Sequence, residues 1–219
     1  MNIFALDQSP EKAAQMHLDR HVVKMIIEYA QLLSTAHRLS DGRFEEHISP
    51  DGRKKKFYLL QDEKVGLFEK IIRFDNGTTE VVQKLGILNP VCYSLSHQNH
   101  PCAVWARTTS TNYSWLYQLF HELSKEYTFR YGKEHKTFKD VGIFLMSLPH
   151  KLPMGNLTPF PQAMPDEFKD KDSIRAYKNY YLGSKAKMAI WTKRPVPSWF
   201  KQEYPNYDDA DFQRTRSVA

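Results

Sequence analysis

The sequence predicts a mainly α-helical protein, a single helical domain around a long N-terminal helix, with a small β element in an insertion. Three observations lead to this prediction. Residues 10–38 and 109–131 each carry helix-capping signals around an apolar face, whereas turn signals gather in residues 39–90. The chain has 219 residues, of which 41% are hydrophobic, enough for one large core. We therefore assign residues 1–207 to one domain with 39–90 as the insertion, and expect 208–219 to form a mobile tail.

The predicted helix over residues 10–38 carries a narrow polar stripe. Ser9 can accept hydrogen bonds from the first turn, Pro10 fits the first helical position, and Gly42 follows the end. At about 100° per residue the polar side chains share one sector, and most of the remaining circumference is apolar. The stripe consists of His17, Arg20, His21, Lys24, Glu28, Gln31, Thr35 and Arg38. A helix so largely apolar is packed on most sides, so the stripe should line a cleft; the alternative is a core helix with one solvated edge.

The later elements are expected to be shorter. In the insertion, residues 57–60 are compatible with a strand, and the spacing of apolar residues over 61–74 favours a helix. A short helix is predicted near 139–148, and the prolines of 149–165 predict an irregular surface segment. A last helix is predicted over 174–192, rich in aromatic residues.

Composition and motifs narrow the class of function. A net charge of +6 favours a polyanionic partner. No apolar run is long enough to span a membrane and no leader opens the chain, so we expect a cytoplasmic protein (the host cytoplasm, if phage-encoded) with no membrane partner. Cys92 and Cys102 lack metal or disulfide-framework spacing and are interpreted as reduced packing residues. Serine-hydrolase, phosphate-loop and dinucleotide motifs are missing, and no cofactor is expected.

The polar stripe offers two kinds of chemistry. His17 and His21 stand four residues apart, a spacing that lets two imidazoles reach one metal ion. Without HExxH or CxxC, however, we predict no metal site. Lys24, flanked by Arg20 and desolvated among apolar residues, would hold a neutral, nucleophilic amine. The alternative is a solvated or phosphate-contacting lysine paired with Glu28.

Two other segments are candidates for binding DNA. The first surrounds the start of the second long helix, where loop amides and a helix N-terminus can host an anion. Its candidates are His97, Asn99, His100, Arg107 and Asn112. The second lies near the C-terminus, where Lys193, Arg194 and Trp199 have the composition of a stacking platform with phosphate contacts. The alternative is an aromatic core seam with surface lysines.

The chain resembles two groups of phage proteins. The stretches MNIFALDQSPEKAAQMHLDRHVVKM, NHP and RPVPSWFKQEY are similar in order to the small phage pyrimidine-dimer DNA glycosylases. The chain also resembles, more closely and along most of its length, an uncharacterised group of tailed-phage proteins that opens with MNIF…HVVKM. The glycosylase resemblance implies a compact, mostly helical enzyme whose short N-terminal arm enters the site.

The resemblance also implies roles for particular residues. His17 stands where the glycosylases keep a helix histidine, and their catalytic glutamate would fall near Lys24. Their nucleophile is the α-amine of a threonine exposed by removal of the initiator methionine. Asn2 has a side chain too large for efficient removal, so here that amine would belong to Met1.

We therefore expect a phage enzyme of glycosylase-like architecture that excises or modifies a pyrimidine in duplex DNA with a displaced or modified base. Lys24 or the Met1 amine would attack the sugar carbon, while His21 or His17 moves protons. Arg20, Glu28 and Arg38 would bind the substrate. His17, His21 and Lys24 should share one pocket. Two alternatives remain: a transferase that adds an amino acid or another group to hypermodified phage thymine, and a non-catalytic protein that binds nucleic acid or a host protein. The oligomeric state is left open.

Overall fold

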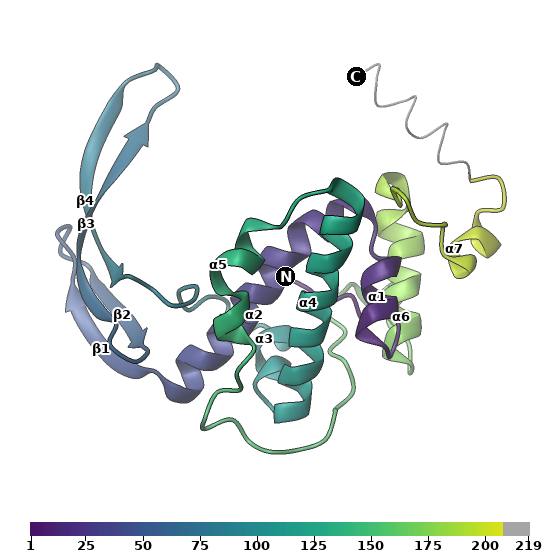
Figure 1. Ribbon diagram of the computed structural model, residues 1–219, viewed down its shortest axis with the longest axis horizontal. Coiled ribbons are helices and arrows are strands. Elements are labelled where there is room, and N and C mark those ends of the chain that lie inside the picture. Colours follow the sequence, from purple (N-terminus) through teal and green to yellow (C-terminus); the bar gives the residue numbers. More distant parts are fainter. Residues whose placement is uncertain (208–219) are drawn as a thin grey trace.

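The computed structural model describes residues 1–207, so the tail expected at 208–219 lies outside the described residues. The described chain combines a helical body with an arm of two antiparallel β-hairpins (Figure 1). The helices are α1 (Pro10–Met16), α2 (Asp19–Asp41), α3 (Pro101–Ala106), α4 (Ser110–Tyr131), α5 (Lys136–Leu145), α6 (Ser173–Tyr180) and α7 (Ser198–Glu203). The strands are β1 (Arg43–Ile48), β2 (Lys54–Leu59), β3 (Lys64–Arg73) and β4 (Thr79–Leu88).

The predicted fold class, mainly α with a small β element, is wrong. From Arg43 to Leu88 the regular elements of the insertion are all strands, with β1 paired to β2 and β3 paired to β4, so the fold mixes α and β with helices dominant. The helix predicted over 61–74 is strand β3. Its apolar residues fit a period near 3.6 and a period of 2 equally well. Two features favour the hairpin over the helix. Gly77 forms a tight turn, and the partner strand β4 is, like β3, rich in β-branched residues.

The long N-terminal helix is divided. His17 and Leu18 have extended backbone angles, with ψ of 132° and 157°, so α1 ends before them and α2 begins after them. The His17 ring stays with α1, because its Nδ1 lies 2.7 Å from the Ala13 carbonyl. The Asp19 amide donates to the Ile190 carbonyl at 2.8 Å, so a distant segment supplies a partner at the break. Contacts between remote segments thus override the local helical pattern.

The core surrounds α2. Helices α3, α4 and α5 pack against α2, and α1 packs against α4. The N-terminal arm runs into the same core, where Ile3, Ala5 and Leu6 are fully buried. Both thiols, Cys92 and Cys102, are free and buried as predicted. Along the polar stripe of α2, His21, Thr35 and Arg38 are therefore buried, whereas Arg20 and Lys24 remain exposed.

Several predicted boundaries are confirmed. Thr109 caps α4 by accepting from the Asn112 amide, and Gly132 ends the helix in the left-handed conformation with φ of 71°. The last predicted helix is shorter than expected. Helix α6 ends at Tyr180 and passes into a π-helical turn, η2 (Tyr181–Lys185).

Among the described residues, no helix is both long enough and apolar enough to cross a membrane.

The hairpin arm is anchored to the body by one buried ion pair. Arg38, on α2, is fully buried, and its guanidinium contacts both carboxylate oxygens of Glu63 at 2.8 and 3.1 Å. It also donates to the carbonyls of Tyr58, Cys92 and Tyr93. The prediction that Arg38 binds substrate is therefore wrong, because all of its donors are used within the protein.

Candidate functional site

A cavity of about 330 Å³ opens beside α2 where the N-terminal arm, α3 and the end of α6 meet. Its lining residues are Met1, Asn2, Phe4, His21, Lys24, Met25, Glu28, His100, Ala163, Tyr180 and Lys185. Four of them follow one another on a single face of α2 at helical spacing. The polar stripe of the sequence therefore does face a cavity over its N-terminal half.

An amine and a carboxylate meet in this cavity. The terminal amine of Met1 lies 3.9 Å from Glu28 Oε2, and Lys24 Nζ lies 3.2 Å from Glu28 Oε1. The Glu28 side chain is only 14% exposed, whereas that of Lys24 is 71% exposed. Glu28 therefore lies between the amine of Met1, whose side chain is nearly buried, and the solvent-exposed amine of Lys24.

The N-terminal arm is held in place by Asn2. Its amide nitrogen donates to the Ala163 carbonyl at 2.9 Å, and its carbonyl oxygen accepts from the Tyr177 hydroxyl at 2.7 Å. The same oxygen accepts from the Ile3 amide. Asn2 is thus bonded both to the proline-rich segment (residues 149–165) and to α6. These bonds fix the position of the neighbouring Met1 amine.

His21 contributes a neutral ring to the cavity wall. It stacks on Phe4 with centroids 4.2 Å apart, and its Nδ1 lies 2.6 Å from the Tyr181 hydroxyl. Burial first, and then nearby positive charges including Lys185, lower the pKa of His21 to about 2. Burial also raises the pKa of Tyr181. Near neutral pH the pair supplies a hydrogen-bonding edge rather than a charge, which disfavours the predicted proton-carrying role of His21.

Positive charge surrounds the rest of the cavity. Lys185, on the π-helical turn, lies over the Tyr180 ring at 4.6 Å from its centroid. His100 caps α3 by accepting from the Cys102 amide, and burial followed by the charge of the terminal amine lowers its pKa. Arg20 is exposed on α2, one turn before Lys24. The amine and carboxylate therefore sit within a predominantly cationic surface.

His17 does not line the cavity, so the prediction that it shares a pocket with His21 and Lys24 is wrong. It is fully buried, with Nδ1 close to the Ala13 carbonyl and Nε2 2.8 Å from the Tyr29 hydroxyl. Burial lowers the pKa of His17 to about 4. Both ring nitrogens are engaged and cannot ligate a metal. Among the described residues, no group of three or more His, Cys, Asp or Glu side chains is arranged to hold one.

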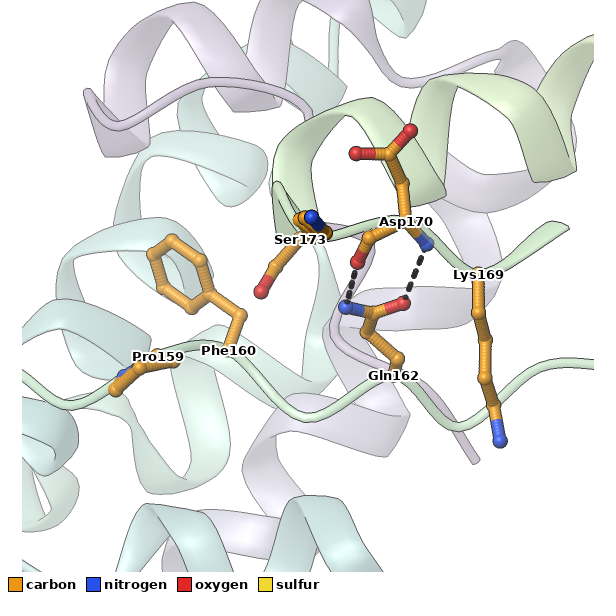
Figure 2. A pocket seen from close by; sticks show the side chains of 7 residues that line it. Pro159, Phe160, Gln162, Lys169, Asp170 and Ser173 are labelled. Atoms are coloured by element: carbon orange, nitrogen blue, oxygen red, sulfur yellow. Dashed lines mark hydrogen bonds between the residues drawn. The ribbon is translucent and has the colours of Figure 1, made fainter. Parts of the chain in front are cut away.

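A second cavity lacks a comparable set of groups. It measures about 670 Å³ and lies between the proline-rich segment (residues 149–165) and the start of α6 (Figure 2). There the Gln162 side chain exchanges two hydrogen bonds with the Asp170 backbone, and Lys169 pairs with Asp166. Its polar side chains are therefore largely satisfied by the protein itself.

The residues predicted around the start of α4 are dispersed. Asn112 is fully buried. Its side-chain amide donates to the Trp105 carbonyl and the Thr158 hydroxyl, and its side-chain oxygen accepts from the Thr158 amide. His97 and Asn99 are exposed in the loop before α3, away from the cavity lining. Arg107 is half-buried, and burial lowers its pKa. Of this group only His100 reaches the cavity.

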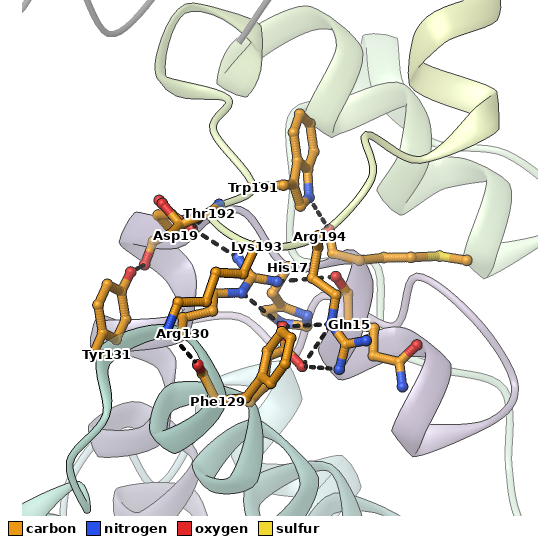
Figure 3. Close-up of polar contacts among 12 residues, drawn as sticks. Gln15, His17, Asp19, Phe129, Arg130, Tyr131, Trp191, Thr192, Lys193 and Arg194 are labelled. Atoms are coloured by element: carbon orange, nitrogen blue, oxygen red, sulfur yellow. Dashed lines mark hydrogen bonds and ion pairs between the residues drawn. The ribbon is translucent and has the colours of Figure 1, made fainter. Parts of the chain in front are cut away.

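The C-terminal basic segment is bound to the helical body (Figure 3). Arg194 pairs with Glu126 at 2.8 Å and lies over the Phe129 ring. The exposed Lys193 donates to the Phe129 carbonyl at 3.1 Å. Beneath them, the buried Arg130 joins Glu126 to Asp19 at the division between α1 and α2. Trp199 is half-buried against Tyr181, so this segment supports the core rather than presenting a stacking platform.

Sequence reasoning missed several cavity residues and misjudged others. Phe4 and Tyr180 carry no motif, and only the hydrophobic opening and the aromatic-rich last helix could have pointed to them. Lys185 belongs to a basic cluster visible in the sequence, but its place depends on the π-helical turn. Glu28 was expected to bind substrate. The terminal amine that it approaches lies 27 residues away in the sequence. Only the tertiary structure brings these groups together.

Comparisons of the chain with models of protein families, with curated proteins and with solved structures find no significant match.

Proposed function

We propose that this chain is an enzyme that acts on a base in DNA, with the Met1 amine as nucleophile and Glu28 as the carboxylate that orients it and accepts its proton. The observation that carries the proposal is the 3.9 Å separation between that amine and Glu28 within a partly open, mostly cationic cavity. An amine held beside a carboxylate is a typical arrangement for covalent catalysis at an electrophilic carbon.

The surroundings favour a nucleotide as substrate. Lys24 and Lys185 at the cavity and the exposed Arg20 nearby would attract phosphate groups, and the chain as a whole carries a net charge of +6. A volume of about 330 Å³ suits one nucleotide and not a duplex, so the target would have to leave the base stack. The neutral His21 would offer a hydrogen bond to a displaced base without placing a charge against it.

The proposed step displaces the base from C1′ of the sugar. The Met1 nitrogen forms a bond to C1′ of the sugar while the bond from C1′ to the base breaks, and the base leaves with the bonding electrons. Glu28 takes the proton that the amine loses, and the departing base ends by gaining one proton. The C1′–O4′ bond then breaks, O4′ takes the bonding electrons and a proton from water, and the nitrogen lone pair forms an iminium to C1′. Water adds to C1′ and releases the amine again.

Lys24 is the weaker candidate for nucleophile. Its side chain is 71% exposed and already paired with Glu28 at 3.2 Å, so it lacks the desolvation that would favour a neutral amine. Its position instead suits contact with a phosphate at the cavity entrance.

Reductive trapping tests the proposal without knowledge of the target base. A duplex oligonucleotide with one abasic site presents the C1′ aldehyde directly, and borohydride would reduce the imine to a stable adduct. We expect peptide mapping to place the adduct at Met1. Glu28→Gln should slow trapping by about a hundredfold, the usual effect of losing a general base, whereas Glu134→Gln, at an exposed carboxylate outside the cavity, should not.

Two results would overturn the proposal. Adducts scattered over surface lysines, with equal rates for the Glu28 and Glu134 variants, would show that the cavity plays no part. An adduct at Lys24 that is absent from the Lys24→Ala variant would show that Lys24, and not Met1, is the nucleophile.

A further inference from the structure

The β3–β4 hairpin leaves one of its faces without a partner. The strands are ten residues long and pair only with each other (Figure 1). The turn of the first hairpin shares a cavity with this hairpin, lined by Ile72, Val82 and Lys84 of one face and by Gln83 and Leu85 at the edge of the other. The opposite face carries the alternate residues of both strands. On that face Leu67, Glu69, Ile71, Arg73, Val81 and Gln83 are all exposed.

The uncovered face is apolar at its centre. Ile71 and Val81 lie directly opposite each other in the register and are 61% and 60% exposed. On the same face Leu67 is 51% exposed. Contiguous exposed apolar side chains usually mark an interaction surface. A two-stranded hairpin is also only marginally stable in water by itself, so this one would gain from a covering layer.

The charges of the arm favour a protein partner over a polyanion. Residues 43–91 include nine basic and eight acidic side chains, so the arm contributes little to the net positive charge of the chain. The basic run at 53–56 is balanced locally, with Lys54 paired to Glu46 and Arg53 near Asp51.

The uncovered face is also complementary to itself. Glu69 and Arg73 lie on it at equal distances from Ile71, two residues before and two residues after. Their cross-strand neighbours, Gln83 and Thr79, are uncharged. Four residues of strand span about 13 Å, so the two charges cannot pair within one chain. A twofold axis through Ile71 would place each Glu69 opposite the Arg73 of another copy.

We propose that this face of the hairpin is a homodimer interface, in which the hairpin of a second copy packs antiparallel across it. Ile71 and Val81 would meet their own counterparts at the axis, with Leu67 of each copy farther out along the strands. Glu69 and Arg73 would form two symmetric ion pairs at the edge of the contact. The assignment is independent of the cavity and of the DNA-directed reaction.

Sedimentation velocity of the full chain over a range of concentrations tests the interface. We expect a dimer that dissociates on dilution, and a monomer for Ile71→Lys at every concentration. Lys70→Ala lies next to Ile71 on the other face and should leave the dimer unchanged. A wild-type chain that stays monomeric throughout, or one that assembles only when DNA is added, would overturn the proposal.

Charge reversal tests the twofold axis itself. Glu69→Arg and Arg73→Glu should each raise the dissociation constant about tenfold or more, because each brings like charges together twice. The double variant restores opposite charges across the axis and should return to within about threefold of the wild type. Additive weakening in the double variant would rule out this axis. Circular dichroism of each variant verifies folding, and the substituted side chains are exposed.

Discussion

At the scale of single residues, the histidines on the polar stripe serve the fold more than the chemistry. His17 connects the end of α1 to Tyr29, whose hydroxyl bonds the Ile3 carbonyl of the N-terminal arm. His21 connects α2 to Tyr181. Both rings are buried and neutral near pH 7, since burial lowers the pKa of each well below its usual value.

This burial predicts that acid destabilises the protein. The pKa of His17 is about 4 in the folded chain and about 6.5 when unfolded, so between these values only the unfolded state binds the proton. Stability is therefore fully present above pH 6.5 and is lost as the pH falls toward 4. This histidine alone should lower the free energy of unfolding by about 2 kcal/mol between pH 7 and pH 5.

Urea denaturation at the two pH values measures the effect. His17→Gln should be less stable than the wild type at pH 7 but should lose less further stability at pH 5. His121→Gln, at a partly exposed histidine on α4, should keep the wild-type dependence. An equal loss in the His17 variant and the wild type would contradict the assignment.

At the scale of elements, each hairpin of the arm depends on a glycine that closes its turn. Gly52 and Gly77 have φ of 78° and 81°, a region that other residues enter at a cost of about 1–2 kcal/mol. A Cβ added at either position would meet nothing within 4 Å, so the cost would be purely conformational. The hairpins contact the body at their base only, so this cost should stay local.

Gly77→Ala should therefore loosen one hairpin and leave the rest intact. We expect faster amide hydrogen exchange in β3 and β4 by about tenfold, which corresponds to about 1.4 kcal/mol, with no change in α2 or α4. Gly52→Ala is the matched variant and should affect β1 and β2 instead. Faster exchange throughout the body after Gly77→Ala would mean that the arm and the helices unfold together.

At the scale of the whole molecule, the arm and the cavity are separate features joined by α2. The cavity lies along the N-terminal half of that helix, and the Arg38–Glu63 pair holds the arm near its C-terminal end. Glu63 also accepts from the amides of Leu60 and Val91, where the chain enters and leaves the β3–β4 hairpin. The hairpin beyond these residues takes no part in these bonds, so we expect the body to fold without it.

Removal of this hairpin should separate assembly from chemistry. Lys64 and Leu88 are paired in the register, so a two-residue turn can replace residues 65–87. We expect the shortened chain to fold, to trap an abasic duplex at Met1 as the full chain does, and to sediment as a monomer at all concentrations. Loss of folding, measured by thermal denaturation, would show that the hairpin is part of the cooperative unit.

The sequence by itself determined the features that depend on neighbouring residues. Ser9 and Thr109 cap their helices as predicted, and Gly132 ends α4, because capping is decided within one turn of helix. The spacing of the polar stripe likewise placed His21, Lys24 and Glu28 on one face. Periodicity could not decide residues 61–74, since the same apolar residues satisfy both a helix and a strand.

Only the tertiary structure decided which polar residues remain available for chemistry. Arg38, Asn112 and Arg194 are residue types that commonly bind ligands. In the folded chain their hydrogen bonds go instead to complementary groups of the protein itself. The approach of the Met1 amine to Glu28 depends in the same way on Asn2 and its partners far along the chain. Charge and polarity are local properties of a sequence. Their pairing depends on distances that exist only once the chain is folded.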